Sequence, residues 1–128
     1  MSFNWKDFLD TAKLLEKTCK DPSNSNFSEA CYRAAISRAY YSVYNLLLNY
    51  AETNLGYPRL NNGVDHSELP KHLQNRSLDF NIKMAGKKLT ALKAKRHDSD
   101  YNETLEINEL DMQSMLKMAD QIINTLKL

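Results

Sequence analysis

Residues 34–44 read AAISRAYYSVY and lie in the middle of a long stretch, between Pro22 and Gly56, that contains no glycine or proline. Apolar residues recur here at the three- and four-residue spacing of an α-helix. The stretch carries small residues, an arginine and three tyrosines where an ordinary core helix would carry leucine. Because apolar residues occupy most sides of this helix, we expect it to lie at the centre of a helical bundle.

Turn residues on both sides of this stretch limit the helix. Residues 21–26 read DPSNSN, which is typical of a turn. Asn26 and Glu29 have the spacing of a capping box, in which the two side chains satisfy free backbone N–H groups. No breaker follows until Gly56. The sequence therefore predicts a helix of about seven turns between Asn26 and Gly56.

The same reasoning predicts helices before and after the central one. Residues 4–20 have helical spacing, with Asn4 as a plausible N-cap. Residues 54–65 are rich in glycine, proline and asparagine and indicate a surface loop. Ser67 can cap a short helix that ends near Arg76.

Two more long helices complete the prediction. One covers residues 80–95 and is followed by a polar stretch at 97–106. Asn108 can cap a last helix that runs to about residue 126. No strand pattern competes with these assignments. We therefore expect an all-α protein, an antiparallel up-down four-helix bundle with an additional short helix, in a single domain over residues 1–128.

The bulk properties of the chain exclude several classes of protein. Its 128 residues suffice for one domain with one core, and 42% hydrophobic residues are ordinary for a globular protein. The net charge of +1 indicates no particular partner. Residues 1–7 lack the apolar run of a signal peptide, and no apolar stretch approaches the roughly 18 residues of a membrane helix. We expect a cytoplasmic protein with no membrane contact.

Metal and redox chemistry are also not indicated. Cys19 and Cys31 form no metal or redox motif, and we expect both to be plain thiols that are buried or half-buried. His66 and His72 have no cysteine or carboxylate in register with them. The sequence therefore predicts no metal site and no cofactor.

Residues 95–101, KRHDSDY, form the second unusual segment. The planar guanidinium of Arg96 can hold a phosphate through two oxygens. Equally, Arg96 can be a helix-end arginine that is favoured by the helix dipole and paired with Asp98 or Asp100. As a histidine, His97 can act in acid–base chemistry, and it can also be an exposed capping residue.

Polar side chains on the central helix need partners. Arg38 must find a carboxylate, a partner chain or a ligand, because burying it unpaired is costly. An ion pair between Arg38 and Asp100 would join the two unusual segments. Tyr41 can stack on nucleic-acid bases, but its position on the face of Ala34 and Ser37 favours packing in the core.

A run of basic residues precedes Arg96. The segment 83–96 contains five lysines and Arg96 but no acidic residue. Such a run can solvate an exposed helix face, or it can bind nucleic acid if it lies beside Arg96. Lys88 and Lys95 are the candidates for nucleic-acid binding within it.

Four segments together resemble the HEPN domain (higher eukaryotes and prokaryotes nucleotide-binding). They are residues 5–12, 29–41, 66–67 and 92–101. The string AISRAYY at 35–41 resembles small prokaryotic members, and the pattern Arg-x-x-x-Asp-Tyr at 96–101 supports the likeness independently.

The resemblance implies an up-down helical fold that is usually a homodimer. Many HEPN proteins are metal-independent endoribonucleases of toxin–antitoxin and phage-defence systems, often beside a minimal nucleotidyltransferase. Their motif is an arginine, a polar residue and a histidine a few positions after the arginine, and two copies meet across the dimer. Here Arg96 matches the arginine, His97 occupies the polar position, and Tyr101 stands where the histidine would be.

Two hypotheses of function follow. In the first, the protein binds RNA or a nucleotide, or acts as a weak metal-independent endoribonuclease, with Arg96, His97 and Tyr101 as candidate catalytic residues. The other candidates are Lys88 and Lys95 for nucleic-acid binding, and Arg38, Tyr41 and Asp100 as supporting residues. In the second, the chain is a non-catalytic module that docks a nucleotidyltransferase, an antitoxin or another partner through its small-residue face.

Overall fold

The computed structural model describes residues 2–76 and 79–128. Its helices are α1 (Lys6–Lys20), the 3₁₀ helix η1 (Pro22–Phe27), α2 (Ser28–Asn54), α3 (Asp65–Arg76), α4 (Phe80–Tyr101) and α5 (Glu109–Leu126). Within these described ranges there is no strand. The prediction of an all-α fold is confirmed.

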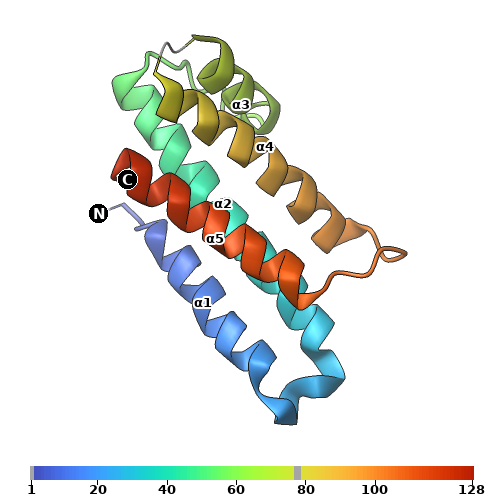
Figure 1. Cartoon of the computed structure of the whole chain (residues 1–128). Coiled ribbons are helices and arrows are strands. Elements are labelled where there is room, and N and C mark those ends of the chain that lie inside the picture. The colour runs from blue at the N-terminus through green and yellow to red at the C-terminus, as the bar shows by residue number, and fades with distance from the viewer. Residues whose placement is uncertain (1, 77–78) are drawn as a thin grey trace.

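The long helices pack side by side around α2. In Figure 1, α1 and α4 flank α2, and α5 lies in front of it between them. Successive long helices run in alternate directions, and the short α3 packs mainly against the beginning of α4 (Figure 1). No helix of the described ranges covers the side of α2 that faces away from α5, where Ala30 and Ala34 are exposed. This arrangement makes α2 the central element, as its apolar pattern predicts.

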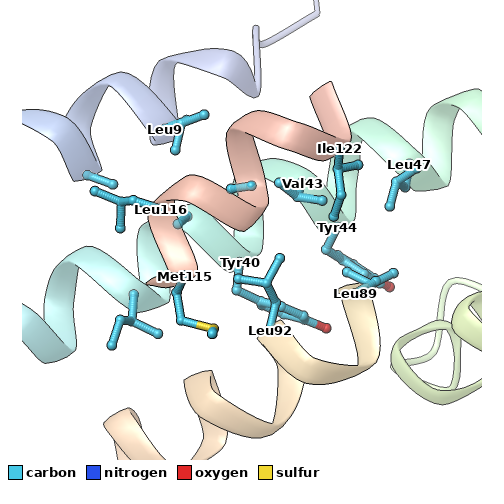
Figure 2. Close-up of a cluster of buried hydrophobic side chains, with 14 of the residues drawn as sticks. Leu9, Tyr40, Val43, Tyr44, Leu47, Leu89, Leu92, Met115, Leu116 and Ile122 are labelled. Carbon is cyan, nitrogen blue, oxygen red and sulfur yellow. The ribbon is translucent and has the colours of Figure 1, made fainter. Parts of the chain in front are cut away.

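Large side chains from four helices meet in the core (Figure 2). From α2, Tyr40 and Leu47 are fully buried, and from α4 so are Leu89 and Leu92. Burying a side chain of this size contributes roughly 1.5–3 kcal/mol relative to leaving it exposed. The core thus depends on α2 touching every other long helix, because its buried residues face α1, α4 and α5 in turn.

The predicted capping box at the start of α2 is wrong. Residues 22–27 continue as a 3₁₀ helix, and the N-cap of α2 is Phe27, which makes no side-chain capping bond. The Glu29 carboxylate instead accepts a hydrogen bond from the backbone N–H of Ile107 at 3.2 Å and bonds Arg33 at 2.9 Å. Glu29 therefore fastens α2 to the segment before α5 rather than capping its own helix.

The other predicted caps have different outcomes. The N-cap position of α1 is Trp5, one residue after the prediction, although Asn4 still accepts the N–H of Lys6 through its side chain at 3.1 Å. The short helix begins at Asp65, so Ser67 lies inside its first turn. The Asn108 cap of α5 is confirmed, because Asn108 and Asp111 form a reciprocal capping box.

The prediction that the third long helix ends near Lys95 is wrong, because α4 continues to Tyr101. Arg33 of α2 explains the extension. Its Nη1 donates to the carbonyl oxygens of Asp98 and Ser99, both at 3.0 Å. The Asp98 carbonyl also accepts the backbone N–H of Asn102 at 3.0 Å, so Arg33 adds a second bond there and a side-chain partner for the Ser99 carbonyl at the helix end. Arg96, His97 and Asp100 therefore sit on the helix, and their directions are set by its geometry.

Candidate functional site

Arg96 points from α4 toward the central helix. It is only 9% exposed, and its guanidinium lies over the Tyr40 ring at 4.9 Å and over the Tyr41 ring at 5.4 Å. On α4, Arg96 shares its face with Leu89 and Leu92, because residues separated by four and seven positions recur on one side of a helix. The inward direction of Arg96 thus follows from the apolar periodicity of α4.

The positive charge of Arg96 has little negative charge near it. Its Nη1 lies 3.8 Å from Oδ2 of Asp100, which is longer than a hydrogen bond. Its Nε is buried and makes no hydrogen bond within the described part of the chain. The two tyrosine rings supply part of the compensation as cation–π contacts. Of the two predicted acidic partners, Asp100 and not Asp98 is thus the one close to Arg96.

The predicted ion pair between Arg38 and Asp100 is wrong. Arg38 is exposed, and its guanidinium lies over the Phe8 ring of α1 at 5.1 Å. The α2 residue that reaches Asp100 is Ser37, whose hydroxyl donates to the carboxylate over a long 3.4 Å. Arg38 and Ser37 diverge because neighbouring helix positions are about 100° apart.

His66, in the first turn of α3, joins the site from the other side. Its ring stacks on the Tyr44 ring at a centroid distance of 4.0 Å and meets the Tyr41 ring edge-on at 6.1 Å. Its Nδ1 lies 2.6 Å from the Tyr40 hydroxyl. Figure 2 shows the hydroxyls of Tyr40 and Tyr44 on the same side of the core. Three tyrosines of α2 therefore contact His66.

The surroundings of His66 disfavour its charged form. Burial lowers its pKa below the usual value, and the charges of Arg96 and Lys93 lower it further. Only Asp65 opposes this effect. The pKa of Tyr40 is raised, chiefly by burial, so its hydroxyl keeps its proton and donates to Nδ1 of neutral His66. We refer to Arg96, Lys93, His66, Tyr40 and Tyr41 as the Arg96 cluster.

His97 and Tyr101 lie on a different face of α4. Both are exposed, and their rings are 5.1 Å apart across one helical turn. His97 is rotated about 100° from Arg96, and Tyr101 about 140°. Within one chain, the three candidate catalytic residues therefore do not converge on one point. Tyr41, by contrast, is half-buried and in contact with Arg96.

The two candidate lysines lie on the opposite flank of α4, toward α5. Lys95 forms an ion pair with Asp111 of α5 at 3.4 Å. Lys88 borders a shallow groove between α4 and α5, together with Phe80 and Gln121. The basic run thus winds around α4 instead of forming one stripe, and Lys93 is the lysine whose charge lowers the pKa of His66.

Expectations from the sequence also concerned the two cysteines, metal sites and membrane helices. Cys19 and Cys31 are free and buried, as predicted. Among the described residues, no three potential ligands from His, Cys, Asp and Glu come close enough to hold a metal ion. No helix in the described ranges has the length and apolarity needed to cross a membrane.

Comparison of the chain with protein-family models, with curated proteins and with solved structures finds no match. The resemblance to HEPN proteins therefore remains a prediction that stands on the quoted segments alone.

Sequence reasoning considered His66 only as a metal ligand and did not place it beside Arg96. The available signal was its position in the segment 66–67, which belongs to the resemblance together with 92–101. The role of Arg33 at the end of α4 was also missed, because nothing local to α4 indicates it.

Proposed function

We propose that this chain is a HEPN-like protein that binds RNA or a nucleotide through a phosphate group held by Arg96. One observation carries the proposal. A buried arginine that has a free Nε and only a loose carboxylate at 3.8 Å retains capacity for an anion. Burying such a charge without close compensation costs free energy, which a bound phosphate would offset.

The aromatic surroundings of Arg96 suit the same ligand. Tyr41 is half-buried beside the guanidinium and has one edge toward solvent. Nucleic-acid bases stack readily on such rings, whereas phosphates bind arginine. The proposed surface therefore consists of Arg96 and Tyr41, with Lys93 adding positive charge. Lys95 and Lys88 lie on the side of α4 that faces α5, so they can add positive charge only from that side.

The proposed catalytic activity is metal-independent cleavage of RNA. In one chain His97 and Tyr101 face away from Arg96, so the three residues can act together only when two copies meet. The resemblance implies such a homodimer, and the uncovered side of α2 offers a place for it. A role in a toxin–antitoxin or phage-defence system belongs to the same proposal.

Binding of a fluorescent oligoribonucleotide in EDTA tests the proposal. We expect Arg96→Gln to weaken binding roughly tenfold or more, the usual effect of losing a charged hydrogen-bonding group. The matched control is Lys87→Gln, which removes the same charge from an exposed position on the opposite face of α4. Equal losses in both variants would indicate nonspecific electrostatics and refute a site at Arg96.

Cleavage is measured on the same RNA in EDTA, with Arg96→Ala prepared identically. Cleavage by the wild type alone would support the ribonuclease. If the wild type binds the RNA but neither protein cleaves it, the ribonuclease part of the proposal fails and the RNA-binding part stands. Circular dichroism of each variant controls for loss of fold.

A second candidate function is docking of a protein partner, such as a nucleotidyltransferase or an antitoxin. Its support is the exposure of Ala30 and Ala34 on the uncovered side of α2, where small residues allow close approach of another backbone. Ala34→Glu would disrupt such a contact and leave RNA binding at Arg96 intact. Comparing the sedimentation of the wild type with that of the Ala34→Glu variant separates this candidate from the first.

A further inference from the structure

The Arg96 cluster contains a titratable group that the proposed function does not use. The His66 ring contacts all three tyrosine rings, and its Nδ1 is bonded to the Tyr40 hydroxyl at 2.6 Å. Its Nε2 makes no hydrogen bond within the described part of the chain, and the residue is half-buried. Nδ1 of His66 is therefore bonded within the protein, whereas Nε2 remains able to bond a ligand.

Charged groups approach His66 from two helices. Arg96 and Lys93 of α4 both act on it with positive charge. Among the described residues, the negative charge that acts on the pKa of His66 is that of Asp65, its neighbour in α3. That carboxylate is already engaged by the Tyr57 hydroxyl at 2.6 Å. It also accepts the backbone N–H groups of Leu60 and Asn61.

The remaining neighbours of His66 carry no charge at neutral pH. They are the phenols of Tyr40, Tyr41 and Tyr44 on α2. Burial raises the pKa of Tyr44 to about 12, so this ring does not supply a negative charge. The cluster thus holds two fixed positive charges, and the Asp100 carboxylate lies 3.8 Å from the guanidinium of Arg96. A third positive charge on His66 is favoured when an anion is also present.

We propose that His66 completes a phosphate-binding site with Arg96 and Lys93, and that it takes up a proton when the anion binds. The inference rests on the proposed function in naming a phosphate, and it adds the residue from α3 and the coupling to pH. In the free protein His66 is neutral. The bound anion balances Arg96 and Lys93 and attracts a proton to Nδ1 of His66, where the Tyr40 hydroxyl turns from hydrogen-bond donor to acceptor.

Thermodynamic linkage sets the direction of the pH dependence. If an anion raises the pKa of His66, then protonation of His66 must tighten anion binding by the same factor. Binding therefore strengthens as pH falls from the His66 midpoint of the complex to that of the free protein. A shift of about one pH unit in this midpoint corresponds to a tenfold change in affinity.

Proton NMR of the histidine rings measures this coupling directly. The chain has three histidines, so the spectrum is simple. His97→Asn and His72→Asn identify the His66 signal by elimination, without altering the cluster. Sulfate is the first probe, because its charge stays constant from pH 5 to 8 while phosphate itself titrates. Chloride at equal ionic strength controls for screening.

We expect sulfate to raise the His66 midpoint by about one pH unit, the usual effect of a nearby opposite charge. Arg96→Gln should abolish this rise, whereas Lys87→Gln should preserve it. An unchanged His66 midpoint in sulfate, while the amide signals around Arg96 respond, would overturn the coupling. If neither set of signals responds to sulfate, there is no anion site and the inference is wrong.

A short oligouridylate is the second probe and separates RNA from a free anion. If both probes raise the midpoint, the ligand class is a phosphate of RNA. If only sulfate does so, the proton-coupled anion site stands while the RNA part of the proposed function fails. If the oligouridylate binds with no change at His66, the proposed function survives and the coupling does not.

Discussion

The Tyr40 hydroxyl lies 2.6 Å from Nδ1 of His66 and joins the central helix to the first turn of α3. Since α3 packs mainly on α4, this bond is one of the few polar links between α2 and α3. The hydroxyl donates to neutral His66, which leaves the ring proton on Nε2. The same contact therefore positions α3 and selects the tautomer that faces the Arg96 cluster.

Replacing Tyr40 by Phe tests the structural part of this relationship. We expect a loss of about 1–2 kcal/mol in the free energy of unfolding, because Nδ1 of His66 is left without its donor. Urea denaturation followed by circular dichroism measures the change. Tyr101→Phe is the control, since Tyr101 is 67% exposed and its hydroxyl can bond water. Equal stability of the two variants would contradict a structural role for the bond.

Arg33 provides a second test, because it holds the end of α4 from α2. Its two terminal nitrogens donate to four backbone carbonyl oxygens, those of Asp98, Ser99, Asn102 and Leu105. We expect Arg33→Ala to lower the free energy of unfolding by about 2 kcal/mol or more, since several partners are lost together. Hydrogen exchange of the amides at 99–107 should also accelerate.

Arg38→Ala is the matched control for Arg33. Arg38 lies on the same helix but is exposed, and its one notable contact is with the Phe8 ring. Such an exposed cation–π contact contributes about 0.5–1 kcal/mol. If both substitutions had the same small effect on stability and exchange, the end of α4 would not depend on Arg33.

These contacts explain which features could be predicted from the sequence. The start of α5 was predictable because its capping box, Asn108 and Asp111, is local in the chain. The end of α4 was not, because Arg33, which donates to the Ser99 carbonyl there, is 66 positions away in the chain. His66 similarly meets Tyr40 across 26 positions.

The candidate site was predictable only in part, because it too combines local sequence features with contacts between distant residues. Arg96 was identified from its residue type and its neighbours in the chain, and it does lie beside Tyr41. Its separation from His97 and Tyr101 depended on whether α4 continued through them. A helix prediction that stopped at Lys95 could not reveal this separation.

Asp65 makes stability depend on pH. Burial alone would raise the pKa of this carboxyl, but the Tyr57 hydroxyl and the N–H groups of Leu60 and Asn61 lower it overall. A carboxyl whose folded pKa is depressed stabilises the protein above its unfolded pKa of about 3.9. This contribution is lost as pH falls through the folded pKa.

Asp65→Asn should therefore be less stable than the wild type at pH 7, and the difference should shrink as pH falls toward 2. Losing the charged acceptor costs about 1–3 kcal/mol at neutral pH. Urea denaturation at a series of pH values measures the difference. Glu103→Gln, an exposed carboxyl in the turn after α4, is the control. A difference that stayed constant across the pH range would show that the Asp65 charge is not responsible.

Gly86 allows α3 to approach α4 closely. A Cβ at this position would lie 2.8 Å from Cγ of Gln74, 2.9 Å from Cβ of Leu73 and 3.1 Å from the carbonyl oxygen of Pro70. Since Leu73 is fully buried and the Pro70 oxygen is backbone, these atoms cannot move aside freely. The short helix would have to shift away from α4 to accommodate a methyl group.

Gly86→Ala therefore sets two effects against each other. Alanine favours a helix over glycine by about 1 kcal/mol, whereas overpacking a tight contact costs about 1–3 kcal/mol. We expect the cost to dominate and the thermal midpoint to fall. Ala94→Gly, at an exposed position of the same helix, calibrates the propensity effect. If Gly86→Ala instead gained the stability that Ala94→Gly loses, α3 would not be held against α4 by this contact.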